Sequence, residues 1–285
     1  MTAELAVRPR GPYSLALSAR FASDATRTFR DGLFTAVLAV EGSPQLARAW
    51  QSTDGTVTVR GESFAAVERL RWILALDNDH SDFLRSVRDD PMLGRASRAL
   101  RGLRPVRVAT VAQALLRAYC GQLIEAKRAR RLEQTIVRSL CAEGPGRLHV
   151  APTGSDLGAL APSQLRRLGL HARRGAALVR LCRSLDLERL HDQPTEAIVR
   201  RLGRERGLGP WSVGVVCLEG LGRYDHGLVG DLGLIKLLRA MRGREVDGAE
   251  TAELLEPYEE WAGLASVYLL AGWGRGLVRI PTLAA

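Results

Sequence analysis

The sequence has few lysines, few aromatic residues and no closely spaced cysteines. Lys127 and Lys236 are the only lysines among 41 basic residues, so nearly all of the positive charge is arginine. Arginine suits phosphate recognition because its planar guanidinium group forms two parallel hydrogen bonds. A GC-rich genome would explain the choice of arginine over lysine, but it would not explain a net charge of +10. The excess of positive charge therefore favours a polyanionic partner.

The four cysteines lie far apart and form no Cys-x-x-Cys motif; they are Cys120, Cys141, Cys182 and Cys217. Structural zinc sites and Cys-ligated iron–sulfur clusters need closely spaced ligands, so we expect no metal and no other cofactor. Buried, reduced thiols in a cytoplasmic protein are the simplest interpretation.

The sequence also lacks a signal peptide and a long apolar run. A membrane-spanning helix needs about 20 apolar residues, so we expect no membrane partner. The hydrophobic fraction of 46% is sufficient for a packed core, which argues against global disorder.

Residues 12–76 have the pattern of a small α+β domain, after an N-terminal tail at residues 1–11 that lacks periodicity. Asp54-Gly55 is typical of a β-hairpin turn. Helical spacing follows over residues 64–74. Strands are expected over residues 13–19, 33–40, 46–51 and 56–60. The fold class is therefore α+β, with a small antiparallel sheet backed by a helix.

Residues 77–285 are almost entirely helical in pattern. Brief connections marked by glycine or proline separate short amphipathic segments, as in a compact helical domain. Helices are expected over residues 83–87, 108–140, 156–160, 162–168, 173–185, 195–204, 211–220, 232–241, 249–255 and 259–270.

A Gly207-Leu208-Gly209 turn lies between two of these helices. Its glycines permit positive φ, and Pro210 suits the first position of the second helix. Amides at the start of that helix lie at its positive end, where a phosphate binds favourably. An ordinary corner between two helices gives the same pattern, so the turn alone is weak evidence.

Asp231 follows about twenty residues later, directly before the amphipathic run Leu232–Leu238. An aspartate at this place commonly caps a helix, and for an isolated residue we would prefer that interpretation.

Together, the turn and the aspartate resemble, in order and distance, the signature of the helix-hairpin-helix DNA glycosylases. Residues 105–280 resemble the 3-methyladenine DNA glycosylase II branch, through Gln113–Leu123 with its Gly-Gln-Leu turn and through the Pro-Thr and Leu-Gly-Leu motifs of Pro152–Arg174. Residues 12–75 are similar, less specifically, to the N-terminal sheet domain of that branch. The resemblance implies a DNA glycosylase that removes alkylated or otherwise damaged bases in base excision repair.

The resemblance implies that Asp231 is the catalytic carboxylate. Cleavage of an N-glycosidic bond builds positive charge on the sugar, which a fixed carboxylate stabilises while it orients the attacking water. Bifunctional relatives carry a lysine where this chain has Trp211, so the resemblance implies a monofunctional hydrolase without a strand-cleaving step.

The same resemblance implies a base pocket bordered by Trp211, Val215 and Tyr268. The branch has a tyrosine and a tryptophan at the last two of these positions, because stacking on a cationic base is favourable. Two interpretations follow: either the pocket is more aliphatic, with an altered choice of lesion, or the protein has drifted from the excision of alkylated bases.

Base excision also requires that the nucleotide leave the stack and that a side chain fill the gap. The resemblance assigns this wedge to Leu123, although a leucine on a helix is more often a core residue. The implied DNA-binding residues are Gln122, Leu123, Gly207, Leu208, Gly209 and Ser212. The implied partner is double-stranded DNA with damaged bases, bound by a monomer in the cytoplasm, at the nucleoid.

Two other functions stay open at this stage. A non-catalytic module could bind DNA lesions with the same hairpin, and the altered pocket positions favour it, whereas Asp231 favours an enzyme. A bifunctional lyase of the endonuclease III type is disfavoured by the missing lysine and the missing cysteine cluster.

Overall fold

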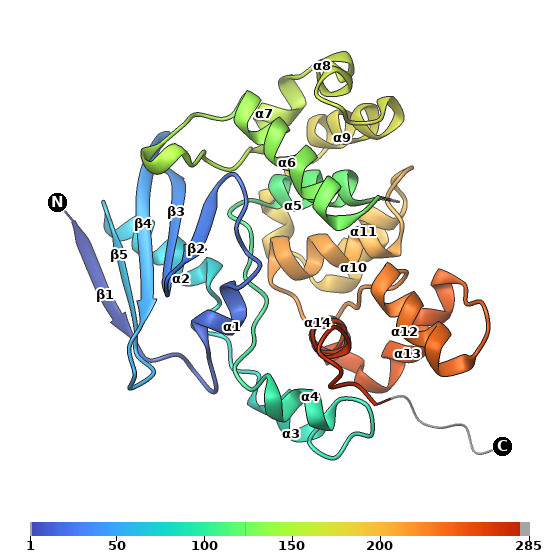
Figure 1. The fold of residues 1–285 in the computed structure, drawn as a ribbon. Coiled ribbons are helices and arrows are strands. Elements are labelled where there is room, and N and C mark those ends of the chain that lie inside the picture. Colours follow the sequence, from blue (N-terminus) through green and yellow to red (C-terminus); the bar gives the residue numbers. More distant parts are fainter. Residues whose placement is uncertain (1, 123, 280–285) are drawn as a thin grey trace.

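The computed structural model of the chain describes residues 2–122 and 124–279. A sheet domain lies at one end of the molecule and a larger body of short helices at the other (Figure 1). All neighbouring strands are antiparallel, in the order β1-β5-β4-β3-β2. The strands are β1 (Ala3–Val7), β2 (Arg27–Arg30), β3 (Leu33–Val40), β4 (Ser43–Gln51) and β5 (Val57–Gly61). The α+β class predicted from the sequence is confirmed.

Helix α2 (Phe64–Ile73) covers one face of the sheet. Alternate residues of β3 are buried on that face, as the two-residue period of a strand requires. At the hairpin between β4 and β5, the Asp54 carboxylate accepts the N–H of Thr56 at 3.0 Å, and Gly55 has a φ of +87°. The Asp-Gly turn thus lies where the sequence predicts it.

Two predictions for this region are wrong. Residues 3–7, expected as part of a loose tail, form the edge strand β1, in which Leu5 lies opposite Val59. Residues expected as the first strand form helix α1 (Leu15–Ala19), where the Ser14 hydroxyl accepts the N–H of Leu17 at 3.2 Å. Pairing with a distant strand determines the structure of the first segment, and a helix cap determines that of the second. A short apolar run in the sequence predicts neither.

The helical body has short helices joined by short loops. The expected helix over residues 108–140 is divided at Gln122, and the one over residues 211–220 continues as a π-helical turn (Val216–Leu221). The helices are α3 (Ser81–Ser86), α4 (Gly94–Ala99), α5 (Val111–Gly121), α6 (Ala126–Leu140), α7 (Gly154–Ala159), α8 (Pro162–Arg167), α9 (Ala172–Ser184), α10 (Thr195–Gly203), α11 (Pro210–Val215), α12 (Leu232–Arg242), α13 (Thr251–Leu255) and α14 (Ala262–Trp273). Within the described ranges, none of them has the length and apolar character that a membrane crossing requires.

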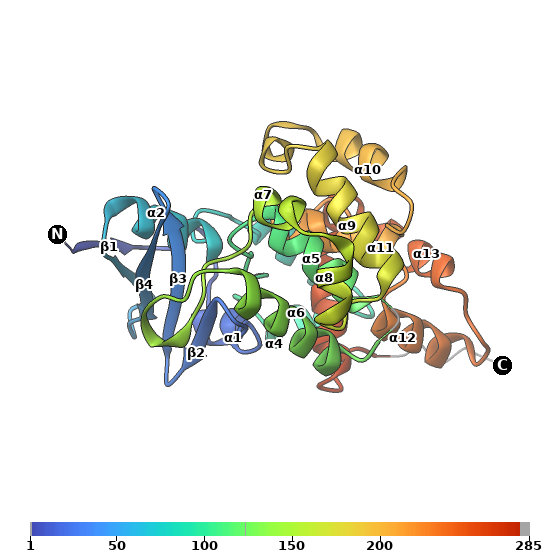
Figure 2. The same cartoon turned by 90° about the horizontal axis from the view of Figure 1, so that it is seen from above.

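The helical body contains two hydrophobic cores beside that of the sheet domain. One core joins α5–α10 with α11 and the π-helical turn, and the other joins α3 and α4 with α12–α14. Seen from above, the sheet domain stands to one side of both groups of helices (Figure 2). The segment expected as one helical domain, residues 77–285, therefore packs as two lobes, and α3 and α4 belong with the C-terminal helices.

A buried arginine connects the sheet domain to the C-terminal lobe. Arg104, which is fully buried, donates hydrogen bonds to the carbonyl oxygens of Ala75 at 2.7 Å and Pro12 at 3.0 Å. Its Nε donates to Nδ1 of His80 at 3.2 Å. Burial and the charge of Arg104 lower the pKa of His80 to about 4 from 6.5.

We expect the free energy of unfolding to fall as the pH drops from 6.5 towards 4, in part because of His80. Its folded pKa is the lower one, so the unfolded chain takes up the proton first and the stabilisation present above pH 6.5 is lost over this range. Urea unfolding at about pH 7 and about pH 5 measures the loss. His80→Gln keeps an acceptor for Arg104 and should show a smaller loss; an equal loss in both proteins contradicts the assignment.

Candidate active site

A cavity of about 950 Å³ opens where the two helical lobes meet the sheet domain. Its walls come from α5 and α6, from α11 with the turn before it and the π-helical turn after it, from α12 with the loop before it, and from residues 21–24 of the sheet domain. The cavity therefore gathers segments from all three cores, and no single segment of the sequence forms it.

Asp231 lies in the wall of this cavity and makes two kinds of contact. Its Oδ1 accepts the N–H groups of Gly233 at 2.7 Å and Leu234 at 3.4 Å, which caps α12. Its Oδ2 accepts the indole N–H of Trp211 at 3.0 Å. Asp231 thus both caps α12 and lines the cavity. The three N–H donors fix the orientation of its carboxylate.

Two buried hydroxyls hold the loop that carries Asp231. The N–H of Gly230, which has a φ of +85°, donates to the Thr251 hydroxyl at 2.7 Å. The N–H of Leu228 donates to the Ser266 hydroxyl at 3.0 Å. Both hydroxyl-bearing residues are fully buried, so water cannot replace them without a rearrangement of the core.

Trp211 forms the wall beside Asp231 and rests on Gly121. A β-carbon on Gly121 would come within 2.5 Å of the indole ring, so only glycine allows this close approach. Val215, one helical turn after Trp211, also lines the cavity. An aliphatic side chain thus follows the indole in this wall.

The Gly-Leu-Gly turn connects α10 to α11 at the edge of the cavity. Gly207 has a φ of +93°, and its carbonyl oxygen accepts Nε2 of Gln122 at 2.6 Å. The same amide nitrogen donates to the Ser212 hydroxyl at 3.0 Å, and Leu208 anchors the turn in the core. No side chain of the described residues caps α11, so the N–H groups of its first turn are available to a ligand.

The structure brings together Asp231, Trp211, Val215, Gln122, Gly207, Gly209 and Ser212 around the cavity. Tyr268 is a correction, because it does not line the cavity. It is fully buried in the C-terminal lobe, where its hydroxyl bonds to the carbonyl oxygen of Leu103 at 3.1 Å and contacts His80. Leu123 lies outside the described residues.

Two large, exposed apolar side chains line the cavity but were not predicted as site residues from the sequence. Phe21, in the loop after α1, is 66% exposed, and Leu232, directly after Asp231, is 54% exposed. A sequence does not distinguish an exposed apolar residue from a buried one, because both have the same side chain.

A charged cluster at the cavity was also missed; it consists of Asp24, Arg117, Glu133 and Glu219. Arg117 donates to Asp24 at 2.8 Å and to both oxygens of Glu133 at 2.9 and 3.0 Å, and its Nη1 also bonds to Glu219. The sequence does contain one signal for this cluster: a single charged residue within an otherwise apolar run, such as Glu219 in residues 213–221.

The pKa values of the two most buried carboxyl groups of the charged cluster shift in opposite directions. Burial raises the pKa of Glu133, and the charge of Arg117 offsets this only in part. Burial also acts to raise the pKa of Asp24, but Arg27 and Arg117 together hold it below its usual range.

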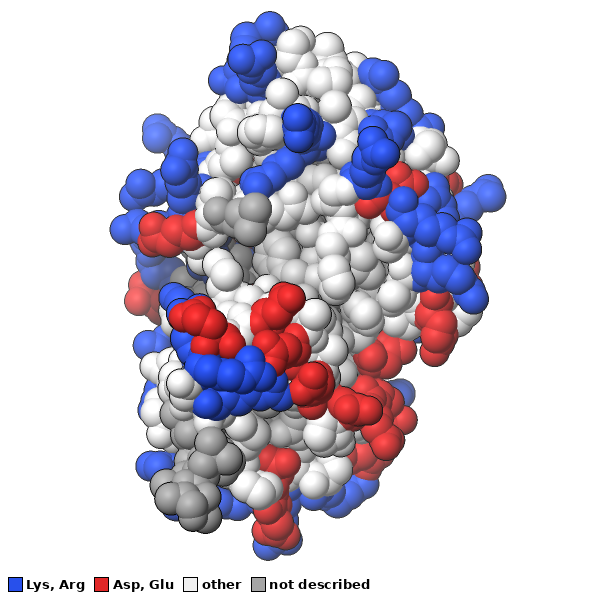
Figure 3. Space-filling view, turned by 90° about the vertical axis from the view of Figure 1, so that its right-hand side faces the viewer, with Lys and Arg blue, Asp and Glu red and all other residues white. Residues whose placement is uncertain are grey.

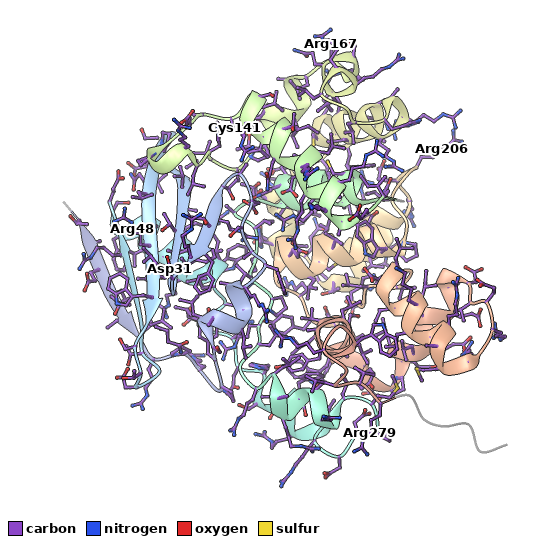
Figure 4. The ribbon with its side chains drawn as sticks, viewed as in Figure 1. Asp31, Arg48, Cys141, Arg167, Arg206 and Arg279 are labelled. Atoms are coloured by element: carbon purple, nitrogen blue, oxygen red, sulfur yellow. The ribbon has the colours of Figure 1, made fainter. Side chains whose placement is uncertain are left out.

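Positive charge lies along one side of the cavity. Lys127, Arg128, Arg130 and Arg131 are exposed along α6, and basic side chains predominate in the upper half of the face in Figure 3. Arg206, in the loop before the Gly-Leu-Gly turn, points away from the body of the protein (Figure 4). These side chains form a surface suited to a polyanion.

The sequence of the chain is similar to that of a known protein. Over 204 residues the chain is 26% identical to a DNA-3-methyladenine glycosylase of Bacillus subtilis (strain 168), an alignment that covers 68% of this chain and 67% of the relative. No model of a protein family matches the chain.

Solved structures share the fold over nearly the whole chain. A 3-methyladenine DNA glycosylase from Archaeoglobus fulgidus superposes with a TM-score of 0.82 at 19% identity, covering 94% of this chain and 97% of that one. An 8-oxoguanine glycosylase/lyase of Clostridium acetobutylicum, solved with double-stranded DNA, gives 0.77 at 13% identity, covering 97% and 98%. The resemblance predicted from the sequence is confirmed, and the chain has the fold of these glycosylases.

The anchor of the Asp231 loop gives a stability prediction. Thr251→Val keeps the shape of the side chain but leaves the buried N–H of Gly230 without its acceptor, which should cost ~1–3 kcal/mol. Thr251→Ser keeps the hydroxyl and serves as the matched control. Urea unfolding of both variants measures the difference; equal losses would show that the methyl group, and not the hydrogen bond, matters.

Proposed function

We propose that the chain is a monofunctional DNA glycosylase that hydrolyses the N-glycosidic bond of damaged bases in double-stranded DNA. The observation that supports this best is the Trp211–Asp231 hydrogen bond at the edge of a cavity large enough for a base. The named activity of the Bacillus subtilis relative and the fold shared with glycosylases support the same conclusion.

Asp231 supplies the electrostatic stabilisation that this hydrolysis needs. As the bond to the base breaks, positive charge develops on C1′ and the ring oxygen of the sugar. A carboxylate already held by Gly233, Leu234 and Trp211 does not have to reorient when that charge appears. The same carboxylate accepts a proton from the attacking water, which then adds to C1′.

Trp211 and Val215 favour binding of a flipped base without covalent chemistry. The indole presents an aromatic surface next to Asp231, and Val215 leaves space beyond it. No amine takes the place of the indole, so the proposed product is an intact abasic site. Lys236, which also lines the cavity, lies on the exposed side of α12, where a backbone phosphate is its natural partner.

The Gly-Leu-Gly turn and the basic side chains account for binding that does not depend on sequence. The uncapped N–H groups of α11 face a ligand at the positive end of the helix. Arginine and lysine on α6 lie beside the cavity, where they neutralise neighbouring phosphates. Phosphate contacts position a duplex and leave discrimination to the base pocket.

Asp231→Asn should lower the single-turnover rate of base release by about 10²–10³-fold or more, because it removes a charge from a cationic transition state. The asparagine oxygen still accepts the N–H of Gly233, but the amide NH2 cannot accept the indole N–H of Trp211. The loss of stability should therefore be limited to about that of one hydrogen bond. Asp156→Asn, in the exposed capping box of α7, is the control. Wild-type rates in Asp231→Asn on a verified substrate would refute the mechanism.

Gly209→Ala should weaken binding to duplex DNA of any sequence while the fold stays intact. A β-carbon at this position meets nothing within 4 Å in the free protein, but it would occupy the space where the turn approaches a phosphate. Fluorescence anisotropy over a range of salt concentrations measures the affinity, which should fall steeply with salt.

Gly203→Ala, in α10, is the control for Gly209→Ala because its β-carbon also meets open space. Equal affinities of the two variants, or an affinity that does not respond to salt, would contradict a phosphate-binding turn.

A further inference from the structure

One wall of the cavity runs along a single helical face. Trp211, Val215 and Glu219 follow one another at four-residue intervals through α11 and the π-helical turn, and all of them line the cavity. Residues at this spacing lie on the same side of a helix. Eight residues span about 12 Å along a helix axis, so Glu219 lies at the other end of this wall from Trp211 and Asp231.

The facing wall runs the same way along α5. Gly121 contacts the indole of Trp211, and Arg117, one turn earlier, bonds to Glu219. Glu133 of α6 and Asp24 of the sheet domain close around Arg117. The charged cluster therefore lies at one end of the cavity, and the Asp231–Trp211 pair lies at the other.

Glu219 differs from the other carboxylates of the charged cluster in what its oxygens contact. Its Oε2 bonds to Arg117, whereas Oε1 has no partner among the described residues. Its side chain is 29% exposed, against 3% for Glu133 and 4% for Asp24. Glu219 thus has a free acceptor that a molecule in the cavity can reach.

We propose that Glu219 is a specificity-determining residue that accepts hydrogen bonds from the far edge of the bound base. This inference rests on the proposed glycosylase function. A carboxylate only accepts, so it selects bases whose far edge carries N–H groups. Guanine-type bases such as 7-methylguanine present a ring N–H and an amino group there, whereas the corresponding edge of 1,N6-ethenoadenine has no N–H.

The pairing with Arg117 makes Glu219 suitable for this role. Arg117 holds one carboxylate oxygen in place, so the other oxygen points in a fixed direction and the side chain does not have to change rotamer when a base binds. A site built to bond an N–H discriminates strongly against a ligand without it, because the acceptor is then left buried and unpaired.

A purely structural role for Glu219 predicts a different result. If the carboxylate only balanced the charge of Arg117, its loss would destabilise the walls and slow the release of every base by a similar factor. Recognition of N–H groups predicts that only bases with those groups are affected. The ratio of rates for two bases in the same protein preparation separates these roles.

The test uses the full chain in excess over duplexes that contain either 7-methylguanine or 1,N6-ethenoadenine. Glu219→Leu should lower the single-turnover rate for 7-methylguanine by about tenfold or more, while the rate for ethenoadenine stays within about twofold of wild type. Glu219→Gln, which keeps the shape and turns a donor towards the base, should change the ratio in the same direction. The Glu219→Gln variant alone tests the proposal if Glu219→Leu does not fold.

Glu205→Leu is the matched control, because Glu205 pairs with Arg201 outside the cavity. It should leave both rates unchanged. Equal slowing of both bases by the Glu219 variants, or no slowing of either, would overturn the role of Glu219 and leave the glycosylase function standing. Release of neither base, and of no other damaged base, by the wild-type protein would overturn both proposals.

Discussion

The hydrogen bond from the indole N–H of Trp211 to Oδ2 of Asp231 is the contact on which the rest of the site depends. It joins the helix that follows the Gly-Leu-Gly turn, which contributes side chains to both helical cores, to the cap of α12. It requires a glycine at position 121, where any side chain would collide with the indole. It also requires the loop before Asp231 to stay where Thr251 holds it. The helix after the Gly-Leu-Gly turn and the Asp231 carboxylate thus meet through one bond with a length of 3.0 Å.

The sequence was sufficient for the parts of the fold and site that are determined locally. Glycines with positive φ, a proline at a helix start and an aspartate that caps a helix follow from rules that operate over a few residues. Asp231, the Gly207–Gly209 turn and the β4–β5 hairpin therefore lie where the sequence predicts them. The resemblance added the relation between the turn and the aspartate, which local rules do not give.

The parts that could not be predicted depend on contacts between distant residues. Strand β1 exists because β5, about fifty residues later, offers it an edge. Tyr268 is buried with its hydroxyl bonded to the carbonyl oxygens of Leu100 and Leu103, more than 160 residues earlier. The charged cluster brings Asp24 of the sheet domain to Arg117, 93 residues away. Periodicity shows that a residue is apolar or charged, but it does not show which surface that residue will meet.

The claim that Asp231 stabilises a cationic sugar is tested most directly by binding to transition-state analogues. Duplexes with a protonated pyrrolidine abasic analogue and with its neutral tetrahydrofuran counterpart differ mainly in the charge at the sugar. The wild-type protein should bind the cationic duplex about 10²-fold or more tightly than the neutral one, and Asp231→Asn should lose most of that preference while it binds the neutral duplex as the wild type does. A preference that is absent in the wild type, or equally strong in Asp231→Asn, would contradict the account.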